Sequence, residues 1–427
     1  MAKTTKTKTK TGRPAEGRVR DQYEAYPYPA RDPRDEAKRL IAGSPGHLLE
    51  LNHFVFAGRR DFGKPFRVLA AGGGTGDGTI MLAQQLADAG CPAEIVYIDL
   101  SDAAREVAEA RAKARKLKNL SFQRLSILDV PKAKLGVFDY IDCCGVLHHL
   151  EDPAAGLSAL ASVLADDGGM GLMVYGQLGR TGVYHAQEML RALSGTDETP
   201  SARVETAKRL LKQLPPSNWL RRNPFLADHL QGGDAGLYDL LLHSQDRSYL
   251  VPEVAALAAQ GGLRIAAFVE PTIYDPAAYL PDPQLLARLE GLDWLARCAF
   301  AEKLAGNMRK HVFYAVKQSR TDETVADPAD MDAVPVFRDA AEAALRDKVQ
   351  PGGVLSATLN GVTFRAPMPP LAAAILKRVD GKRTLGAIRK EVRADNPGLD
   401  DAGFADQFGR LYAPLNGMCK LFLKVPA

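Results

Sequence analysis

Two kinds of hydrophobic pattern take turns along residues 66–317. Short apolar runs of strand length are each followed by stretches in which apolar residues recur every three to four positions. This pattern predicts strands at 66–71, 94–99, 120–125, 137–143, 169–175, 263–269 and 311–316, and helices at 77–89, 102–117, 153–165, 182–194 and 251–261. Alternating strands and helices indicate an α/β fold around a doubly wound, mostly parallel sheet.

The regular rhythm is interrupted twice within this core. Residues 195–250 are helical in pattern but broken by Pro215-Pro216 and Gly232-Gly233, which predicts an inserted helical cap. Residues 271–309 form a second, largely helical excursion, with its helix expected at 283–304. The last strand then follows this excursion.

The ends of the chain differ from the core. Residues 1–20 carry seven Lys and Arg residues against Glu16 alone, and we expect a disordered basic tail. Residues 21–65 form a lead-in whose Tyr23–Pro29 segment is rich in tyrosine and proline. We expect this segment to be extended, as a lid over a ligand or as a strap on the sheet edge.

Residues 318–334 are polar without a period and predict a linker to a small α+β domain at 335–427. Asn360-Gly361 between two apolar runs predicts a hairpin of strands 354–359 and 362–366. Three short helices at about 370–379, 384–393 and 400–413, then a strand at 418–425, complete the pattern. This combination resembles a winged-helix module.

Composition removes several classes of protein. The five cysteines include no C-x-x-C pair, so neither a disulfide framework nor a metal site is expected. No apolar run is long enough to span a bilayer, and no secretory signal precedes the core. We expect a cytoplasmic protein with no membrane partner.

The segment Phe66–Asp77 carries the clearest chemical signal. An apolar strand enters a glycine-dense turn that opens a helix, which is how nucleotide-like ligands are held in open α/β sheets. The dinucleotide spacing G-x-G-x-x-G fails, because its last place falls on Asp77 or Thr79. An adenosine ligand without phosphates tolerates the Asp77 carboxylate better than a pyrophosphate would. A glycine loop that only makes a tight turn is the alternative.

This segment resembles the first motif of class I S-adenosylmethionine-dependent methyltransferases, with Gly72, Gly74 and Gly76 on its three glycines. The resemblance implies a seven-stranded Rossmann-like sheet whose last strand is antiparallel, and S-adenosylmethionine as cofactor. One position departs from the family. The acid that helps hold the methionine amino group is Ala70 here, and Asp77 is the nearest candidate to replace it.

Two later strands supply further candidate cofactor contacts. Asp99, followed by Leu100, ends the second strand 23 residues after Gly76, the place of a ribose-binding acid. A helix N-cap is the alternative role for Asp99. After the third strand, Asp129 matches by position the family's adenine-binding acid, with Leu128 beside it. A turn-forming role is the alternative there.

The fourth strand leads into Gly145-Val-Leu-His-His-Leu-Glu-Asp-Pro153, which resembles a segment of small-molecule methyltransferases of quinone biosynthesis. The resemblance places Gly145 and Val146 beside the cofactor. His148 or His149 is a candidate general base, because imidazole titrates near neutral pH. A structural histidine is the alternative. Tyr175, Arg180 and Tyr184 follow the fifth strand and are candidate acceptor contacts.

These features predict a methyltransferase enzyme whose acceptor is unidentified. Bacterial protein-lysine methyltransferases have a similar core, middle and tail layout, which favours a protein side chain as acceptor. A small-molecule acceptor, a tRNA acceptor and a catalytically inactive binding protein are the alternatives. The basic residues at 377–393 are interpreted as a solvated helix face, so nucleic acid is not the expected partner. The sequence leaves the oligomeric state open.

Overall fold

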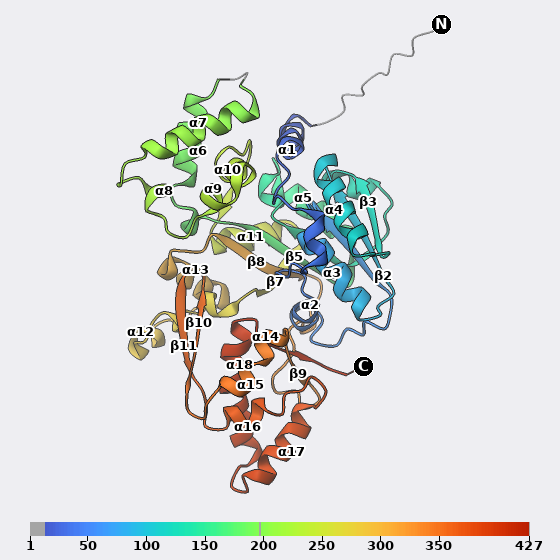
Figure 1. Ribbon diagram of the computed structural model, residues 1–427. Helices are drawn as coiled ribbons and strands as arrows, with labels where there is room; N and C mark the ends of the chain where they lie inside the picture. Colours follow the sequence, from blue (N-terminus) through green and yellow to red (C-terminus); the bar gives the residue numbers. More distant parts are fainter. Residues whose placement is uncertain (1–12, 196–197, 427) are drawn as a thin grey trace.

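The computed structural model describes residues 13–195 and 198–426. Its centre is one sheet in the order β3-β2-β1-β4-β5-β8-β7, with the short β6 paired to β5 (Figure 1). The strands are β1 (Phe66–Ala71), β2 (Ala93–Asp99), β3 (Leu120–Arg124), β4 (Phe138–Cys144), β5 (Leu164–Gly176), β6 (Ser248–Tyr249), β7 (Leu263–Phe268) and β8 (Lys310–Lys317). All pairs are parallel except those of β8, which is antiparallel to both neighbours. The predicted methyltransferase-type sheet with an antiparallel last strand is therefore confirmed, with β6 as an addition.

Helices cover both faces of the sheet and bury an apolar layer on each. One face holds α5 (Pro153–Ala161), α11 (Val251–Gln260) and α13 (Trp294–Ala305). The other face holds α2 (Leu48–Val55) and α3 (Asp77–Asp88). α4 (Asp102–Ala114) lies beside α3 and contacts β2 and β3. The strand order reverses between β1 and β4, and such a reversal opens a ligand crevice at the carboxyl ends of the strands.

Residues 183–195 and 198–241 form a helical layer beyond the sheet with its own apolar core (Figure 1). Its helices are α6 (Val183–Leu193), α7 (Pro200–Gln213), α8 (Trp219–Arg222), α9 (Asp228–Gln231) and α10 (Gly233–Leu241). The second excursion contains the 3-10 turns η5 (Pro271–Tyr274) and η6 (Pro276–Ala278), the short α12 (Pro283–Ala287), and α13.

The C-terminal part has a separate apolar core. Its elements are β9 (Val334–Phe337), α14 (Ala340–Ala343), α15 (Leu345–Lys348), β10 (Val354–Leu359), β11 (Val362–Pro367), α16 (Ala372–Leu376), α17 (Leu385–Asp395), α18 (Asp401–Gly417) and β12 (Leu421–Lys424). β10 and β11 form the expected hairpin, with Asn360 and Gly361 both at positive φ. β12 closes back on β9. The winged-helix resemblance of this part stays a prediction.

The C-terminal part is fixed to the core through α2. The buried His53 contacts Tyr412 and Asn416 of α18 at 3.1 Å each, and accepts from the Leu423 amide at 3.3 Å. Phe422 of β12 belongs to the apolar layer beneath the sheet. Through these contacts the C-terminal part packs against the core.

The N-terminal prediction needs a correction. The basic tail was expected to be disordered through residue 20, but α1 is a helix over Pro14–Ala25 and therefore includes Tyr23. Proline at its first turn suits a helix start, and Ala15 and Gln22 are buried. Residues 1–12 lie outside the described part of the chain. In the same lead-in, 33–37 form the 3-10 turn η1 (Pro33–Ala37).

Across residues 13–195 and 198–426, no helix combines the length and apolar character that a bilayer span requires.

Candidate active site

A cavity of about 590 Å³ opens at the carboxyl ends of β1, β2 and β4. The glycine loop forms one wall and residues 145–146 form another. α1 and residues 28–29 cover it, and Asp239 of α10 reaches in from the helical layer. The cavity size and its largely concave, partly apolar walls are typical of small-ligand sites.

The glycine loop has the backbone of a ligand cradle. Gly72, Gly74 and Gly76 all have positive φ, and Gly76 directly precedes α3. A side chain at Gly72 would come within 2.6 Å of Val146, so only glycine fits that close approach. Gly145 also has positive φ and lines the cavity. The four predicted glycines and Val146 are therefore brought together.

Asp99 lies where a ribose-binding acid would lie. Its carboxylate accepts from the Gly74 amide at 2.8 Å and from the Ser101 amide at 2.9 Å. Burial raises the pKa of Asp99, and the backbone N–H groups of Ser101 and Gly74 oppose that effect. Ser101, not Asp99, caps α4 by accepting from Ala104. Asp99 and Leu100 both line the cavity, so the geometry agrees with the predicted ribose role.

Asp129 is the predicted cofactor residue that the structure does not bring to the cavity. Its carboxylate is about half exposed and pairs with Arg13 at 3.3 Å. Its neighbour Leu128 does line the cavity, as do residues 125–127. Of the predicted adenine pair, the structure therefore places Leu128 at the site and leaves Asp129 outside it.

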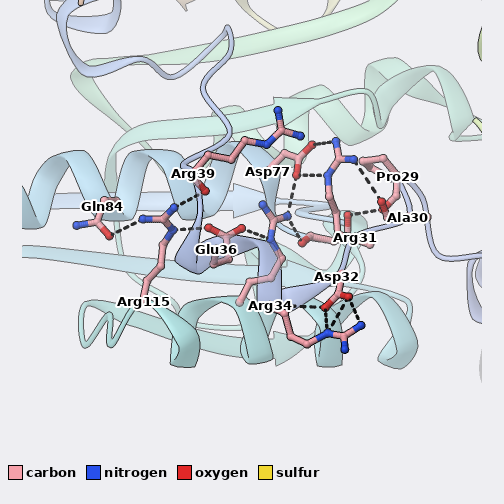
Figure 2. Close-up of polar contacts among 12 residues, drawn as sticks. Pro29, Ala30, Arg31, Asp32, Arg34, Glu36, Arg39, Asp77, Gln84 and Arg115 are labelled. Carbon is pink, nitrogen blue, oxygen red and sulfur yellow. Dashed lines mark hydrogen bonds and ion pairs between the residues drawn. The ribbon is translucent and has the colours of Figure 1, made fainter.

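Asp77 lines the cavity but is already paired with two arginines (Figure 2). Arg31 donates to its two oxygens at 2.8 and 2.6 Å, and Arg111 donates to Oδ1 at 2.7 Å. Burial would raise the pKa of Asp77, but the hydrogen bonds from Arg31 and Arg111 outweigh it and lower the pKa. Asp77 thus connects the lead-in segment to the glycine loop. Because two arginines already neutralise its carboxylate, it is poorly suited to bind a ligand cation.

The rest of this network fixes the lead-in on α4. Glu36 of η1 is buried and accepts from both Arg111, at 2.7 Å, and Arg115 (Figure 2). Thr75 of the glycine loop donates to the Pro29 carbonyl at 2.8 Å. Residues 28–36 therefore form a cover bound by charged hydrogen bonds. The lid or strap was predicted at Tyr23–Pro29; of that segment Tyr23 lies in α1, and Tyr28 and Pro29 line the cavity.

His149 belongs to a buried polar cluster at the cavity. The Tyr23 hydroxyl lies 3.0 Å from Asp239 Oδ1, 3.4 Å from His149 Nε2 and 3.3 Å from His243 Nε2. Tyr175 donates to Asp239 Oδ2 at 3.1 Å. Tyr23, His149, Tyr175 and Asp239 all line the cavity. Sequence reasoning missed Asp239 and His243, because they come from the helical insertion and have no motif around them.

Backbone groups determine which ring nitrogen carries the proton in His149 and His243. The Gln245 amide donates to His243 Nδ1 at 3.0 Å, so His243 carries its proton on Nε2. His149 Nδ1 lies 3.0 Å from the Gln245 carbonyl and must donate to it, which leaves His149 Nε2 free to accept. Burial lowers the pKa of His149 to about 3 and raises that of Asp239 to about 6. At neutral pH the imidazole is neutral and the carboxylate is ionised.

The same proton assignment disfavours a metal at this cluster. His149, Asp239 and His243 offer ligand atoms within 4.8 Å of one another. A metal at His243 Nε2 would require that nitrogen to be deprotonated while Nδ1 accepts from Gln245, which a neutral imidazole cannot satisfy. The cluster is better described as a chain of proton donors and acceptors.

The other candidates lie behind this cluster. His148 is buried outside the cavity lining, against the Tyr175 ring at 3.8 Å between centroids. Neither of its ring nitrogens has a hydrogen-bond partner among the described residues. Arg180 lies over the Tyr175 ring at 3.6 Å and pairs with Asp246 at 3.1 Å. Arg180 and Tyr184 are not in the lining, so of the predicted acceptor contacts only Tyr175 faces the cavity.

Comparison with known proteins identifies the core. Residues 69–170 match the family model described as a methyltransferase domain. The chain is 33% identical over 262 residues to the uncharacterized protein syc1184_c of Synechococcus, covering 60% of each chain. It is 32% identical over 102 residues to the ubiquinone biosynthesis O-methyltransferase of Albidiferax ferrireducens, covering 24% of this chain and 38% of that one. The chain thus spans 60% or less of the length of these relatives.

Among solved structures, PKMT2 from Rickettsia typhi in complex with AdoHcy is similar to this chain with a TM-score of 0.60. The match covers 95% of this chain and 76% of that one at 17% sequence identity, which shows a shared fold. The family match confirms the predicted methyltransferase domain, and this likeness confirms its Rossmann-like fold.

Proposed function

We propose that this protein, which carries a methyltransferase domain, transfers a methyl group from S-adenosylmethionine to a nucleophilic side chain of a protein. One observation carries the proposal. The glycine loop with Asp99 and the polar cluster around Tyr23 line a single cavity. A cofactor cradle and a set of polar groups that could contact an acceptor are therefore joined in one cavity.

The residues of the cavity fit the cofactor. Gly72, Gly74 and Gly76 all have positive φ and line the cavity, and Asp99 can accept from ribose hydroxyls. When bound, S-adenosylmethionine supplies an electrophilic methyl group on a sulfonium. The chain then has to position and desolvate the acceptor more than activate it.

The polar cluster suits an acceptor that must lose a proton. The Asp239 carboxylate, whose pKa burial raises to about 6, is the stronger base of the cluster, and His149 Nε2, with its ring orientation fixed by Gln245, can accept a hydrogen bond from the acceptor. The Asp239 carboxylate and the hydroxyls of Tyr23 and Tyr175 can hold a cationic amine before it is deprotonated. A lysine side chain is long and narrow enough to enter a cavity of this kind, so a protein amine is the acceptor we favour.

The accessory parts support a protein acceptor. The helical layer of residues 183–195 and 198–241 contributes Asp239 to the cavity, and the β10–β11 hairpin reaches back to the core through Asn307, which donates to the Asn360 carbonyl at 2.8 Å. Large parts outside the cofactor domain offer surface for docking a second protein. The likeness to PKMT2 extends over these parts as well, since it covers 95% of the chain.

A small phenol or hydroxyl compound is the second candidate. The 32% identity over 102 residues to a ubiquinone biosynthesis O-methyltransferase favours it, as does a cavity within the ~300–1,000 Å³ range of small-ligand sites.

The test is transfer of radiolabelled methyl groups from S-adenosylmethionine into an extract of the source cells. Label is then separated into protein, RNA and small-molecule fractions, with the Asp99→Ala variant as the inactive control. We expect label in protein, recovered as methylated lysine after acid hydrolysis. Label confined to the small-molecule or RNA fraction would refute the protein acceptor. Cofactor binding without transfer to any fraction would favour a binding protein.

A further inference from the structure

The first-motif acid is replaced by Ala70, so this chain needs another partner for the amino group of the cofactor. Asp77, the candidate closest in sequence, is neutralised by Arg31 and Arg111. We infer that Asp142 of β4 binds the α-ammonium group of the methionine portion of S-adenosylmethionine. The inference rests on the proposed function, because it concerns the same cofactor site.

Strand register places Asp142 beside the missing acid. β1 and β4 are parallel neighbours, and Ala70 pairs with Asp142. Paired residues of parallel strands point to the same face, and the strands are about 4.8 Å apart. A carboxylate on β4 can therefore reach the space that a carboxylate at position 70 would occupy. On the other side of β4, Asp142 pairs with Gly171 of β5.

The surrounding residues leave room for this side chain. Asp142 has Ala70 on one side and Gly171 on the other, and both are small. A Cβ at Gly78, in the first turn of α3, would come within 2.7 Å of Asp142 Oδ2. A Cβ at Gly46 would lie 3.8 Å from the same oxygen. Glycine at 78 is thus required for the observed position of the carboxylate.

The carboxylate faces the cavity without a partner of its own. Asp142 is a cavity-lining residue and only 7% exposed. Its Oδ1 is buried and accepts no hydrogen bond from any described residue. No Lys, Arg or His in the described parts of the chain forms an ion pair with it, in contrast to Asp77. A buried carboxylate without partners is costly, and a ligand cation at the cavity would relieve that cost.

Charge and position together identify the ligand group. Burial alone raises the pKa of Asp142 to about 7, with no nearby cation to oppose it. S-adenosylmethionine carries two cationic centres, the sulfonium and the ammonium. The ammonium has N–H donors that match a carboxylate oxygen and the sulfonium has none, so the ammonium is the group that Asp142 binds.

The test compares ligands with and without the ammonium. Isothermal titration of the full chain uses S-adenosylhomocysteine, its analogue lacking the α-amino group, and 5′-methylthioadenosine. The variants are Asp142→Asn and, as matched control, Asp88→Asn on the exposed end of α3. We expect Asp142→Asn to weaken S-adenosylhomocysteine about tenfold or more, with affinity for 5′-methylthioadenosine unchanged. Asp88→Asn should change neither.

The wild-type protein provides a second measurement that needs no variant to fold. It should lose affinity when the α-amino group is removed from the ligand, and the Asp142→Asn protein should be insensitive to that removal. The assignment would be overturned if Asp142→Asn lost affinity equally for all three ligands, or if it bound S-adenosylhomocysteine as tightly as the wild type does. Failure of the wild-type protein to bind S-adenosylhomocysteine would instead refute the proposed function.

Discussion

The buried, unpaired carboxylate of Asp142 should destabilise the protein when no ligand is bound. The Asp142→Asn variant tests this expectation. Burial raises the pKa of Asp142 from 3.8 to about 7 in the folded chain. In the unfolded chain the group ionises near its ordinary value. Between these two values the folded state therefore holds a proton that the unfolded state has released, so stability falls as pH rises through this window.

The size of the effect follows from the shift. Each pKa unit is worth 1.36 kcal/mol, so the full shift of about 3 units corresponds to roughly 4 kcal/mol at and above neutral pH. Between pH 5 and pH 7.5 the wild type should lose about 2.5 kcal/mol of folding stability through this group. Asn does not titrate, so Asp142→Asn should gain that amount relative to the wild type over the same range. For a core of this size the gain corresponds to a difference in Tm of about 5–10 °C.

The assay is urea and thermal unfolding of the ligand-free wild type, Asp142→Asn and Asp88→Asn, followed by circular dichroism at pH 5, 6, 7 and 7.5. Asp88 is exposed, so its variant should follow the wild type at every pH. Saturating S-adenosylhomocysteine should restore the stability of the wild type at high pH. The same ligand should raise the stability of Asp142→Asn much less. Parallel loss of stability in the wild type and Asp142→Asn as pH rises would refute the reasoning.

Three further predictions concern the cavity walls. Asp99→Ala should weaken S-adenosylhomocysteine about tenfold or more by calorimetry, since it also frees the Gly74 amide that Asp99 holds; unchanged affinity would remove Asp99 from the site. Arg31→Met removes two of the three hydrogen bonds on Asp77, so amide hydrogen exchange at 28–36 and ligand release should both be faster; Arg34→Met, which loses only a local contact, is the control. Tyr23→Phe removes the hydroxyl at the centre of the polar cluster, so kcat should fall about 10- to 100-fold while ligand affinity is kept, and a kcat equal to that of the wild type would contradict the proton-transfer role.

Much of the fold could be predicted because it depends on local patterns. The two hydrophobic periods located the strands and helices of the core within a few residues, since each element must bury one face. The Asn360-Gly361 turn was visible for the same kind of reason, because both residues tolerate positive φ. The helix at Pro14–Ala25 was missed, because its surroundings are strongly basic and its stabilising contacts come from distant residues. Among those contacts, the Ser126 hydroxyl donates to Glu16 at 2.7 Å.

The candidate site likewise contains residues that the sequence predicted correctly and residues that it did not. Gly72, Gly74 and Gly76 were predicted from a glycine-dense turn that resembles the methyltransferase first motif, and Asp99 from its place at the end of the next strand. Asp129 matched the family's adenine-binding position equally well, yet its carboxylate pairs with Arg13. Spacing places a residue near a site but does not orient its side chain.

The sequence by itself determined the class of domain, its cofactor loop and the absence of the usual acid at Ala70. Only the tertiary structure decided which carboxylates are free to act. Asp77 is neutralised by Arg31 and Arg111, while Asp142 lies unpaired beside Ala70 across a strand pairing. The physical reason is that the charge state of a buried acid depends on neighbours brought together by sheet register and helix packing, and these are separated by tens of residues along the chain.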